Sequence, residues 1–154
     1  MKNLEQLLER LEYECVQGSL DKEITDLVYD SRKAATDSLF VCVKGTTVDG
    51  HSFAADVVQK GATVLVVSED VNVPETVTVV KVADTRYALA LLSAAWFDYP
   101  AEQLKVIGIT GTKGKTTTTY MVKSILEGAG YKVGLIGTIE AIIGDKVIPS
   151  ANTT

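Results

Sequence analysis

The chain has 154 residues, enough for one well-formed hydrophobic core or two small ones, and a formal net charge of −5. An acidic chain offers no general basic surface, which argues against a nucleic-acid-binding protein. Hydrophobic residues make up 46% of the sequence and aromatic residues 6%. This balance, with many Val, Ala, Leu and Ile residues, is typical of an α/β protein.

The cysteines and the N-terminus bear on the compartment. Cys15 and Cys42 lack metal-ligand spacing, so we expect two buried thiols in a reducing environment. The first residues are charged throughout and lack the apolar core of a signal peptide, and no apolar run is long enough to span a membrane. We therefore expect a cytoplasmic protein that does not engage a membrane.

The first hundred residues alternate short helix and strand patterns. Leucines at helical spacing predict a helix over residues 3–12, with a polar outer face. A second helix is expected over 53–60 with Ser52 as its N-cap, and a third after Asp84 as its N-cap. Apolar and β-branched runs predict strands at residues 24–29, 39–43, 62–67 and 77–82.

Two polar features of this region are candidates for function. Asp30-Ser31-Arg32 follows a predicted strand, where α/β proteins commonly place ligand-contacting groups, although the spacing by itself favours a capped turn. His51, the single histidine, has no second metal ligand or nucleophile nearby. We interpret it as a solvated or capping residue, not as a catalytic one.

The segment Asp98-Tyr99-Pro100-Ala101 divides the chain. Proline cannot continue a helix and restricts the residue before it, so the third helix should end here and a short linker should follow. We predict a first domain over residues 1–99 and the beginning of a second over residues 100–154.

The second domain opens on the most informative stretch of the sequence. The run 106–109 is apolar and β-branched, as in a buried parallel strand, and a helix pattern covers 115–128. Between them lies Gly111-Thr112-Lys113-Gly114. A strand, a glycine loop and a helix that begins with Lys-Thr form the arrangement that holds polyphosphates, because amides at a helix N-terminus are unpaired and partly positive.

The loop departs from the general phosphate-loop motif. That motif requires a glycine where this chain has Ile109, so the loop is shorter than the standard one. A glycine turn between a strand and a helix would be the simplest alternative, but it does not explain a Lys-Thr pair at the helix start. We therefore predict a nucleotide site in which Lys115 reaches the outer phosphates and Thr116 ligates Mg²⁺.

The remainder of the chain is short. A parallel strand is expected at 132–136 and a hairpin at 139–143 and 146–148, with its turn at Gly144-Asp145. No acidic residue follows an apolar strand after the loop, and no purine-binding segment is evident. We expect these residues to be the front part of a longer enzyme.

Residues 109–118, Ile-Thr-Gly-Thr-Lys-Gly-Lys-Thr-Thr-Thr, resemble the shortened phosphate loop of the Mur ligases, the ATP-dependent amide-forming enzymes of peptidoglycan precursor synthesis. The first domain adds a set similar to the uridine-nucleotide-binding domain of the ligases that add the third amino acid and the terminal dipeptide. That set is Asp30-Ser31-Arg32, Leu39-Phe40-Val41, Gly45, Asp49-Gly50-His51-Ser52-Phe53 and Gly61-Ala62. Gly137-Thr138 and Asn152-Thr153-Thr154 resemble the third-residue enzymes in particular.

This resemblance implies a small N-terminal uridine-nucleotide-binding α/β domain, followed by the start of a phosphate-loop ATPase domain with a parallel sheet. It implies ATP and Mg²⁺ as cofactors. The ATP site would comprise Gly111, Thr112, Lys113, Gly114, Lys115, Thr116 and Thr117, with Lys115 catalytic and Thr116 on the metal. The UDP-MurNAc substrate would contact Ser31, Thr46, Thr47, Val48, Asn152, Thr153 and Thr154.

The implied reaction begins with phosphorylation of the D-glutamate γ-carboxyl of UDP-MurNAc-L-Ala-D-Glu by ATP. The amine of a diamino acid, meso-diaminopimelate or L-lysine, then attacks the acyl phosphate. The family's selecting domain and further metal-binding residues lie beyond this sequence, so we expect no turnover from these residues alone, and a monomer at full length. Lys113 stands where the family more often has asparagine, and an extra cation there could strengthen phosphate binding.

Three alternatives remain open on the sequence. The chain could belong to the UDP-MurNAc-tripeptide–D-Ala-D-Ala ligase. It could be a small, complete phosphotransferase of the general phosphate-loop kind, which would need a magnesium-binding carboxylate after the loop. It could also act as a non-catalytic UDP-sugar-binding module.

Overall fold

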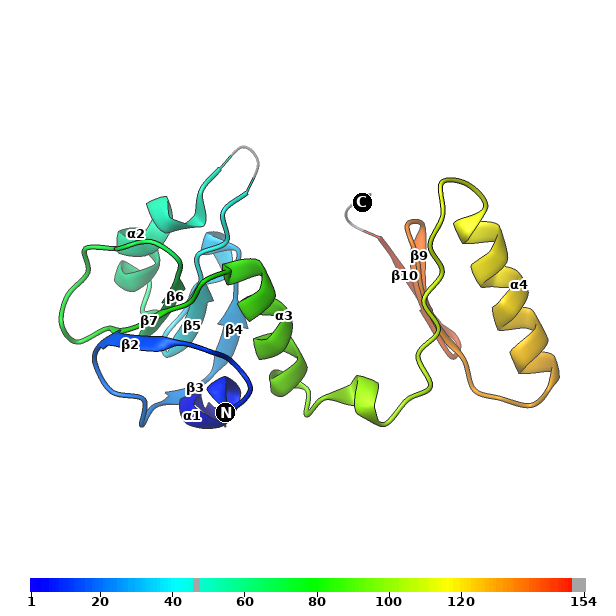
Figure 1. Ribbon diagram of the computed structural model, residues 1–154, viewed down its shortest axis with the longest axis horizontal. Helices are drawn as coiled ribbons and strands as arrows, with labels where there is room; N and C mark the ends of the chain where they lie inside the picture. The colour runs from blue at the N-terminus through cyan, green and yellow to red at the C-terminus, as the bar shows by residue number, and fades with distance from the viewer. Residues whose placement is uncertain (46–47, 151–154) are drawn as a thin grey trace. The chain divides into compact units, whose positions relative to one another are not determined.

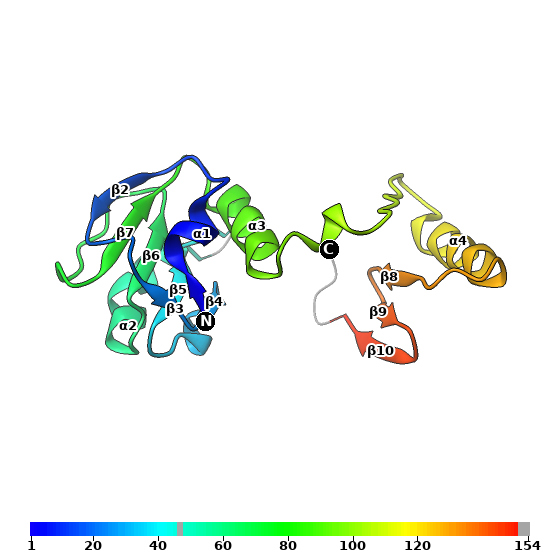
Figure 2. The ribbon, with the colours of Figure 1, turned by 90° about the horizontal axis from the view of Figure 1, so that it is seen from below.

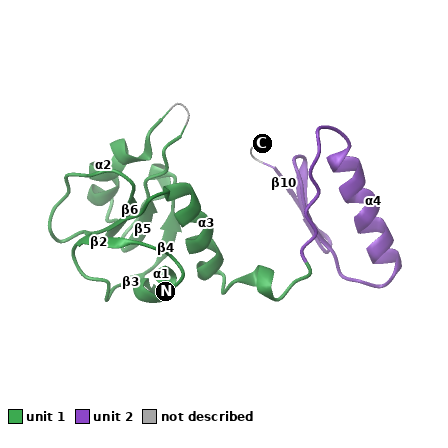
Figure 3. Ribbon diagram, viewed as in Figure 1, with its two compact units in different colours: residues 1–105 green, residues 106–154 purple. Residues whose placement is uncertain are grey.

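The computed structural model describes residues 1–45 and 48–150. The chain separates into two compact units, residues 1–105 and residues 106–154, coloured separately in Figure 3. Each unit has its own secondary structure, and each is described by itself below.

A five-stranded sheet forms the centre of the first unit, in the order β2-β7-β6-β5-β4 (Figure 1). Four of its strands run parallel: β4 (Asp26–Val28), β5 (Ser38–Val41), β6 (Val64–Val67) and β7 (Thr78–Lys81). The fifth strand, β2 (Glu14–Gln17), pairs antiparallel with β7 at the edge. β2 was not predicted, because its four mostly exposed residues carry no clear alternation of apolar and polar side chains.

Helices cover both faces of this sheet (Figures 1 and 2). α1 (Leu4–Leu8) and α3 (Thr85–Trp96) pack on one face, where Leu7 and Leu92 join strand residues such as Val64 in one hydrophobic cluster. α2 (Ala54–Gln59) packs on the other face around Val57. β5 and β6 are buried at every position, which explains why their sequences are continuously apolar.

Two predicted elements of this unit are shorter than expected. The helix predicted over 3–12 is the five-residue α1, although Leu11 beyond its end is still buried. The strand predicted over 24–29 is divided at Thr25, whose N–H and hydroxyl donate to the carbonyl oxygens of Asp37 and Thr36. Before the break, β3 (Glu23–Ile24) pairs with β1 (Lys2–Asn3), whereas β4 after it pairs with β5.

Residues near the N-terminus of the first unit contact the residues at its C-terminal end. After α3, Asp98 and Tyr99 both adopt left-handed backbone angles, φ 57° and 52°, and the 3₁₀ turn η3 (Pro100–Glu102) follows. Lys2 forms an ion pair with Asp98, and Arg10 forms one with Glu102. The Arg10 guanidinium also lies 3.8 Å from the centre of the Tyr99 ring, a cation–π contact.

The second unit contains one helix and a small antiparallel sheet. α4 (Lys115–Gly128) covers the residues that the sequence predicted. The sheet order is β10-β9-β8, with β8 (Gly134–Ile136), β9 (Glu140–Ile143) and β10 (Lys146–Pro149). The predicted hairpin is confirmed, and its turn uses Gly144 at φ 58°, an angle that glycine adopts without a steric penalty.

The prediction of parallel strands in this unit is wrong for the described residues. Residues 106–109 form no strand, and Val106 and Ile107 are 71% and 62% exposed. The segment expected to pair beside them, 132–136, contributes β8, which instead pairs antiparallel with β9. A strand exists only when a neighbouring strand accepts its hydrogen bonds, and the local sequence pattern does not reveal that neighbour.

Candidate functional sites

The glycine loop lies directly before α4. Residues 105–111 have no regular secondary structure, and Gly114 occupies the N-cap position of α4 with left-handed angles, φ 78° and ψ −4°. An L side chain rarely adopts these angles, which accounts for glycine at this position. No side chain caps the helix. The first amides of α4 therefore point out of the helix end without a side-chain acceptor, as an anion site requires.

Lys115 is the first residue of α4, and its side chain turns back over the loop. Its Nζ donates a hydrogen bond of 2.6 Å to the carbonyl oxygen of Gly111. Its backbone carbonyl accepts a hydrogen bond of 2.7 Å from the hydroxyl of Thr119, one turn further along. The ammonium is thus held beside the same loop whose amides face the helix end, so both can act on one polyphosphate.

The side chains around this loop suit an anion better than they suit a free metal ion. Lys113 and Lys115 are both exposed, and Thr116 is half-buried at the second helical position. Within the described residues, no group of three His, Cys, Asp or Glu side chains could hold a metal ion. The Thr116 hydroxyl could therefore provide one ligand to Mg²⁺, with phosphate oxygens providing others.

A second candidate site lies in the first unit, at the carboxyl ends of its parallel strands. Ser31 follows β4 in the 3₁₀ turn η1 (Ser31–Lys33), which Asp30 caps by accepting from the backbone N–H of Arg32. The predicted capped turn is confirmed. The Arg32 guanidinium also donates to both Asp30 carboxylate oxygens, at 2.9 and 2.7 Å. Hydrogen bonds from the Arg32 side chain, and then from its backbone N–H, lower the pKa of Asp30 to about 2.

Ser31 is held by its backbone, and its side chain is available for a ligand. Lys60, the C-cap residue of α2, donates from Nζ to the Ser31 carbonyl oxygen at 2.9 Å, and also to Asp56 at 2.7 Å. The Ser31 hydroxyl makes no hydrogen bond to any of the described residues. This is the arrangement expected of a residue that donates a hydrogen bond to a bound molecule.

The loop after β5 lies at the same end of the sheet. Its base is closed by an antiparallel bridge between Lys44 and Asp49, and the N–H of Gly45 donates to the carbonyl oxygen of Val48 at 2.9 Å. Val48 is 54% exposed. Of the other predicted substrate residues, Thr46, Thr47, Asn152, Thr153 and Thr154 lie outside the described residues.

The expectation that Ser52 caps α2 is wrong, and of the two alternatives for His51, solvated or capping, the solvated one is wrong. Ser52 does not cap α2: Asp49 caps the 3₁₀ turn η2 (Gly50–Phe53) that precedes it, and the Ser52 hydroxyl donates to the Asp49 carbonyl oxygen. His51 is not solvated, since its side chain is only 8% exposed and both of its ring nitrogens have partners. The sequence could not show this burial, because the contacting residue, Ser68, is 17 positions away.

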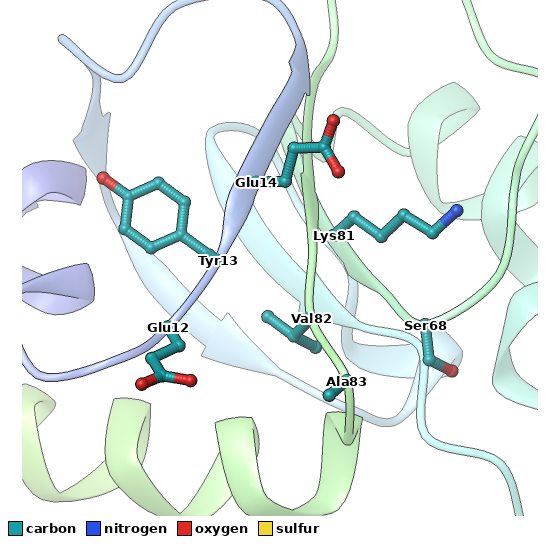
Figure 4. Close-up of a pocket in the computed structure, with 7 residues that line it drawn as sticks. All are labelled: Glu12, Tyr13, Glu14, Ser68, Lys81, Val82 and Ala83. Atoms are coloured by element: carbon teal, nitrogen blue, oxygen red, sulfur yellow. The ribbon is translucent and has the colours of Figure 1, made fainter.

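A shallow hollow of about 390 Å³ lies near the end of β7 (Figure 4). Its walls include Tyr13, Ser68, Lys81 and Val82, and none of the predicted site residues lines it. Lys81 forms an ion pair with Asp70 at 2.6 Å. We place the candidate sites at the glycine loop and at the ends of β4 and β5, where unpaired amides and an available hydroxyl occur.

Comparison with known families matches both units. Residues 23–97 match the family described as "Mur ligase family, catalytic domain", and residues 109–154 match the "Mur ligase middle domain". The chain belongs to the Mur ligase family. The two matches occur in chain order and include both the Ser31 turn and the glycine loop.

Several curated Mur ligases are close relatives. The UDP-N-acetylmuramoyl-L-alanyl-D-glutamate–2,6-diaminopimelate ligase of Clostridium perfringens is 50% identical over 151 residues, which is 98% of this chain and 31% of that protein. The ligase of the same name from Geobacillus thermodenitrificans is 46% identical over 98% of this chain and 30% of its own length. The chain thus spans about three-tenths of the length of the curated relatives that it matches.

Solved Mur ligase structures share the fold. A crystal structure of MurF from Acinetobacter baumannii has a TM-score of 0.60 and 37% identity, over 82% of this chain and 27% of that one. A UDP-N-acetylmuramoyl-L-alanyl-D-glutamate–2,6-diaminopimelate ligase structure has a TM-score of 0.73 over 96% of this chain and 30% of that one. Its identity is 18%, so this second likeness concerns the fold alone.

Within the described residues, no helix is long and apolar enough to cross a membrane.

Proposed function

We propose that this chain is the N-terminal part of a ligase that adds 2,6-diaminopimelate to UDP-N-acetylmuramoyl-L-alanyl-D-glutamate in peptidoglycan precursor synthesis. The observation that carries the proposal is the 50% identity over 98% of the chain to a ligase of that name, through both units. The MurF similarity, 37% over 82% of the chain, makes a dipeptide-adding ligase the second candidate.

In this proposal the second unit binds ATP. The amides at the start of α4 and the Lys115 ammonium hold the phosphates, and the exposed Lys113 adds a second positive charge at the mouth of the loop. The Thr116 hydroxyl would be one ligand of Mg²⁺, and the bound ion would neutralise phosphate charge. Positioning and charge neutralisation are the main aids to transfer of a phosphoryl group.

The first unit binds the uridine nucleotide at the carboxyl ends of its parallel strands, the usual ligand edge of such sheets. The Ser31 hydroxyl donates to the diphosphate, while Lys60 and the Asp30 cap hold the turn that carries it. Val48 borders the nucleotide from the next loop, together with Thr46 and Thr47. Asn152, Thr153 and Thr154 would contact the UDP-MurNAc substrate from the second unit.

The reaction then joins a carboxylate to an amine. A carboxylate is a poor electrophile, so the D-glutamate γ-carboxyl takes the γ-phosphoryl group of ATP, and ADP leaves. The diamino acid attacks this acyl phosphate, which forms the amide and releases inorganic phosphate. In this proposal Lys115 neutralises charge on the transferred group, and the first unit holds the acceptor by its nucleotide end.

The binding half of the proposal can be tested on this chain. UDP and Mg·ATP are titrated separately into it by calorimetry, and each is expected to bind with one site. Absence of UDP binding would refute the assignment of the first unit, and absence of ATP binding would refute that of the second.

The catalytic half needs the complete gene product. It is incubated with ATP, UDP-N-acetylmuramoyl-L-alanyl-D-glutamate and either diaminopimelate or L-lysine, and the products are separated by mass. A diaminopimelate amide is expected. Formation of the lysine amide alone, or reaction of D-alanyl-D-alanine with the tripeptide substrate instead, would refute the proposed specificity.

A further inference from the structure

His51 is the one histidine of the sequence, and it joins the segments that follow β5 and β6, at the carboxyl ends of these strands. Its Nδ1 lies 2.6 Å from Oδ1 of Asp49, in the loop after β5. Its Nε2 accepts a hydrogen bond of 3.0 Å from the backbone N–H of Ser68, directly after β6 (Figure 4 labels Ser68). With its side chain only 8% exposed, the imidazole forms a buried bridge between these two strand ends.

The partners determine which ring nitrogen carries the proton. The backbone N–H of Ser68 can only donate, so Nε2 must be unprotonated, and the proton belongs on Nδ1, which donates to Asp49. The Ser68 hydroxyl oxygen also lies near this ring nitrogen, 3.4 Å from Nε2. The bridge therefore needs a neutral imidazole of one defined tautomer.

The bridge acts on the polypeptide that carries Val48. Asp49 accepts from both the backbone N–H and the ring of His51, and these two bonds are the main reason why the pKa of Asp49 lies below its usual range. The backbone of Asp49 in turn pairs with that of Lys44 across the base of the loop. Because Asp49 is held at the end of β6, Val48, the residue directly before it, is held there as well.

Charged groups around the bridge hold the other side of the loop base, at Lys44. Lys44 forms an ion pair with Glu69 at 2.5 Å, and its Nζ lies 3.9 Å from Asp49. Arg86 of α3 donates to the carbonyl oxygen of Lys44 at 3.0 Å. Lys44 and Asp49, the two sides of the loop base, are therefore both bonded to neighbouring elements. The buried bonds are those made by the His51 side chain.

We propose that His51 is a positioning residue for uridine-nucleotide binding, which holds the polypeptide carrying Val48 against the end of β6. The inference rests on the proposed function, since that function assigns Val48 to the border of the nucleotide. His51 does not touch the nucleotide in this proposal. It lowers the cost of binding because Val48 and Asp49 are held in one arrangement before the ligand arrives.

Two substitutions separate the two bonds of the bridge. In His51→Asn the amide nitrogen can replace Nδ1 as donor to Asp49, but nothing reaches Ser68. In His51→Gln the longer side chain brings its amide oxygen near the position of Nε2, where it can accept from Ser68. We expect His51→Asn to weaken UDP binding about fivefold to tenfold, the effect of one neutral hydrogen bond, and His51→Gln to recover part of that loss.

The readouts distinguish positioning from general stability. Mg·ATP affinity should be unchanged in both variants, because the glycine loop belongs to the other unit. In the complete gene product, the KM for the UDP substrate should rise while kcat and the KM for ATP stay the same. Folded variants with unaltered UDP affinity would overturn the inference, and so would an equal loss of UDP and ATP affinity.

A measurement on the unmodified chain covers the case in which a variant fails to fold. Because the sequence has a single histidine, its two ring ¹⁵N signals need no assignment by mutation. They should report a proton on Nδ1, and adding UDP should shift the Val48 amide signal while the Ser68 amide signal stays in place. A proton on Nε2, or an unmoved Val48 amide signal at saturating UDP, would overturn the inference. If the unmodified chain binds no UDP, this inference and the proposed substrate fail together.

Discussion

The Nζ of Lys115 donates a 2.6 Å hydrogen bond to the carbonyl oxygen of Gly111, four residues earlier in the same loop. The ammonium is exposed and contributes nothing to a core, so its removal should spare the fold. We predict that Lys115→Ala in the complete ligase lowers turnover by about a hundredfold or more, the effect of losing a positioned charge stabiliser in phosphoryl transfer. Steady-state release of phosphate measures this.

A lysine on the same helix provides the control for that variant. Lys123 pairs with Glu127 at 2.7 Å, one turn along α4, and lies away from the loop. Lys123→Ala should keep near-normal turnover and Mg·ATP affinity. Near-normal turnover in Lys115→Ala would remove the assignment of the phosphate site.

We predict that Ser31→Ala weakens UDP binding but leaves ATP binding unchanged. The turn keeps its shape in this variant, because its cap comes from Asp30 and its other support from Lys60 on the Ser31 carbonyl. Loss of one hydrogen bond to a charged group costs about 1.5–3 kcal/mol, or one to two decades of affinity. Calorimetric titration of each nucleotide into the 154-residue chain measures the difference.

Ser19 is a matched control, since it is an exposed serine in the same unit and follows β2. Its hydroxyl accepts only from the backbone N–H of Asp21, at 3.2 Å, in the described part of the chain. Ser19→Ala should therefore bind UDP like the unmodified chain. An equal loss of UDP and ATP affinity in Ser31→Ala would indicate a folding defect and would contradict the uridine site.

The Asp30–Arg32 pair predicts a response to acid. A pKa of about 2 in the fold is lower than the ordinary aspartate value near 3.9, so the ionised carboxylate stabilises the turn at pH values above 3.9. That contribution decreases below pH 3.9 and is lost as the pH falls through about 2. An NMR titration of the Asp30 carboxyl carbon should give a midpoint near 2. The variant Arg32→Ala should raise it toward the ordinary value, and an unchanged midpoint there would contradict the pairing.

The two thiols should differ sharply in reactivity. Cys42 is fully buried, and burial followed by the charge of Asp49 raises its pKa to about 12, whereas Cys15 is exposed. Because the thiolate is the reactive form, a thiol reagent at pH 8 should modify one cysteine per folded chain and two in denaturant. Cys15→Ser should leave almost no reaction in the folded chain. Rapid modification of Cys42 in the native state would contradict the packing of β5.

Local patterns predicted the parts of the fold that depend on near neighbours. The helix 115–128 was predicted to the residue, because Lys115 marks its start after a glycine and Gly128-Ala129-Gly130 its end. Asp84 was correctly predicted as a cap because its side chain accepts from amides two and three residues ahead. The buried strands β5 and β6 were visible as apolar runs. The resemblance to the Mur ligases was visible in the loop residues themselves, and residues 109–154 match the middle domain of that family.

The predictions that failed depend on partners distant in the sequence. Residues 106–109 have the composition of a strand, but no described strand pairs with them. His51 was interpreted as solvated or capping, and its burial was missed because its partner, Ser68, belongs to another strand end. β2 was not predicted because the strand that pairs with it in the described part of the chain, β7, lies more than 60 residues later. In each case the deciding contact is a tertiary one, which periodicity does not encode.

The ties between the first ten residues and the end of the first unit affect how this unit can fold. Lys2 and Arg10 find Asp98 and Glu102 across 96 and 92 positions of sequence, nearly the whole length of the unit. During synthesis the first turn of helix leaves the ribosome with its partners still unmade, and its buried leucines have no finished core to join. Lys2 and Arg10 can form these ion pairs only after Asp98 and Glu102 have emerged. The contacts between the two ends of the unit are therefore of high sequence separation, which is the slow kind of contact in folding.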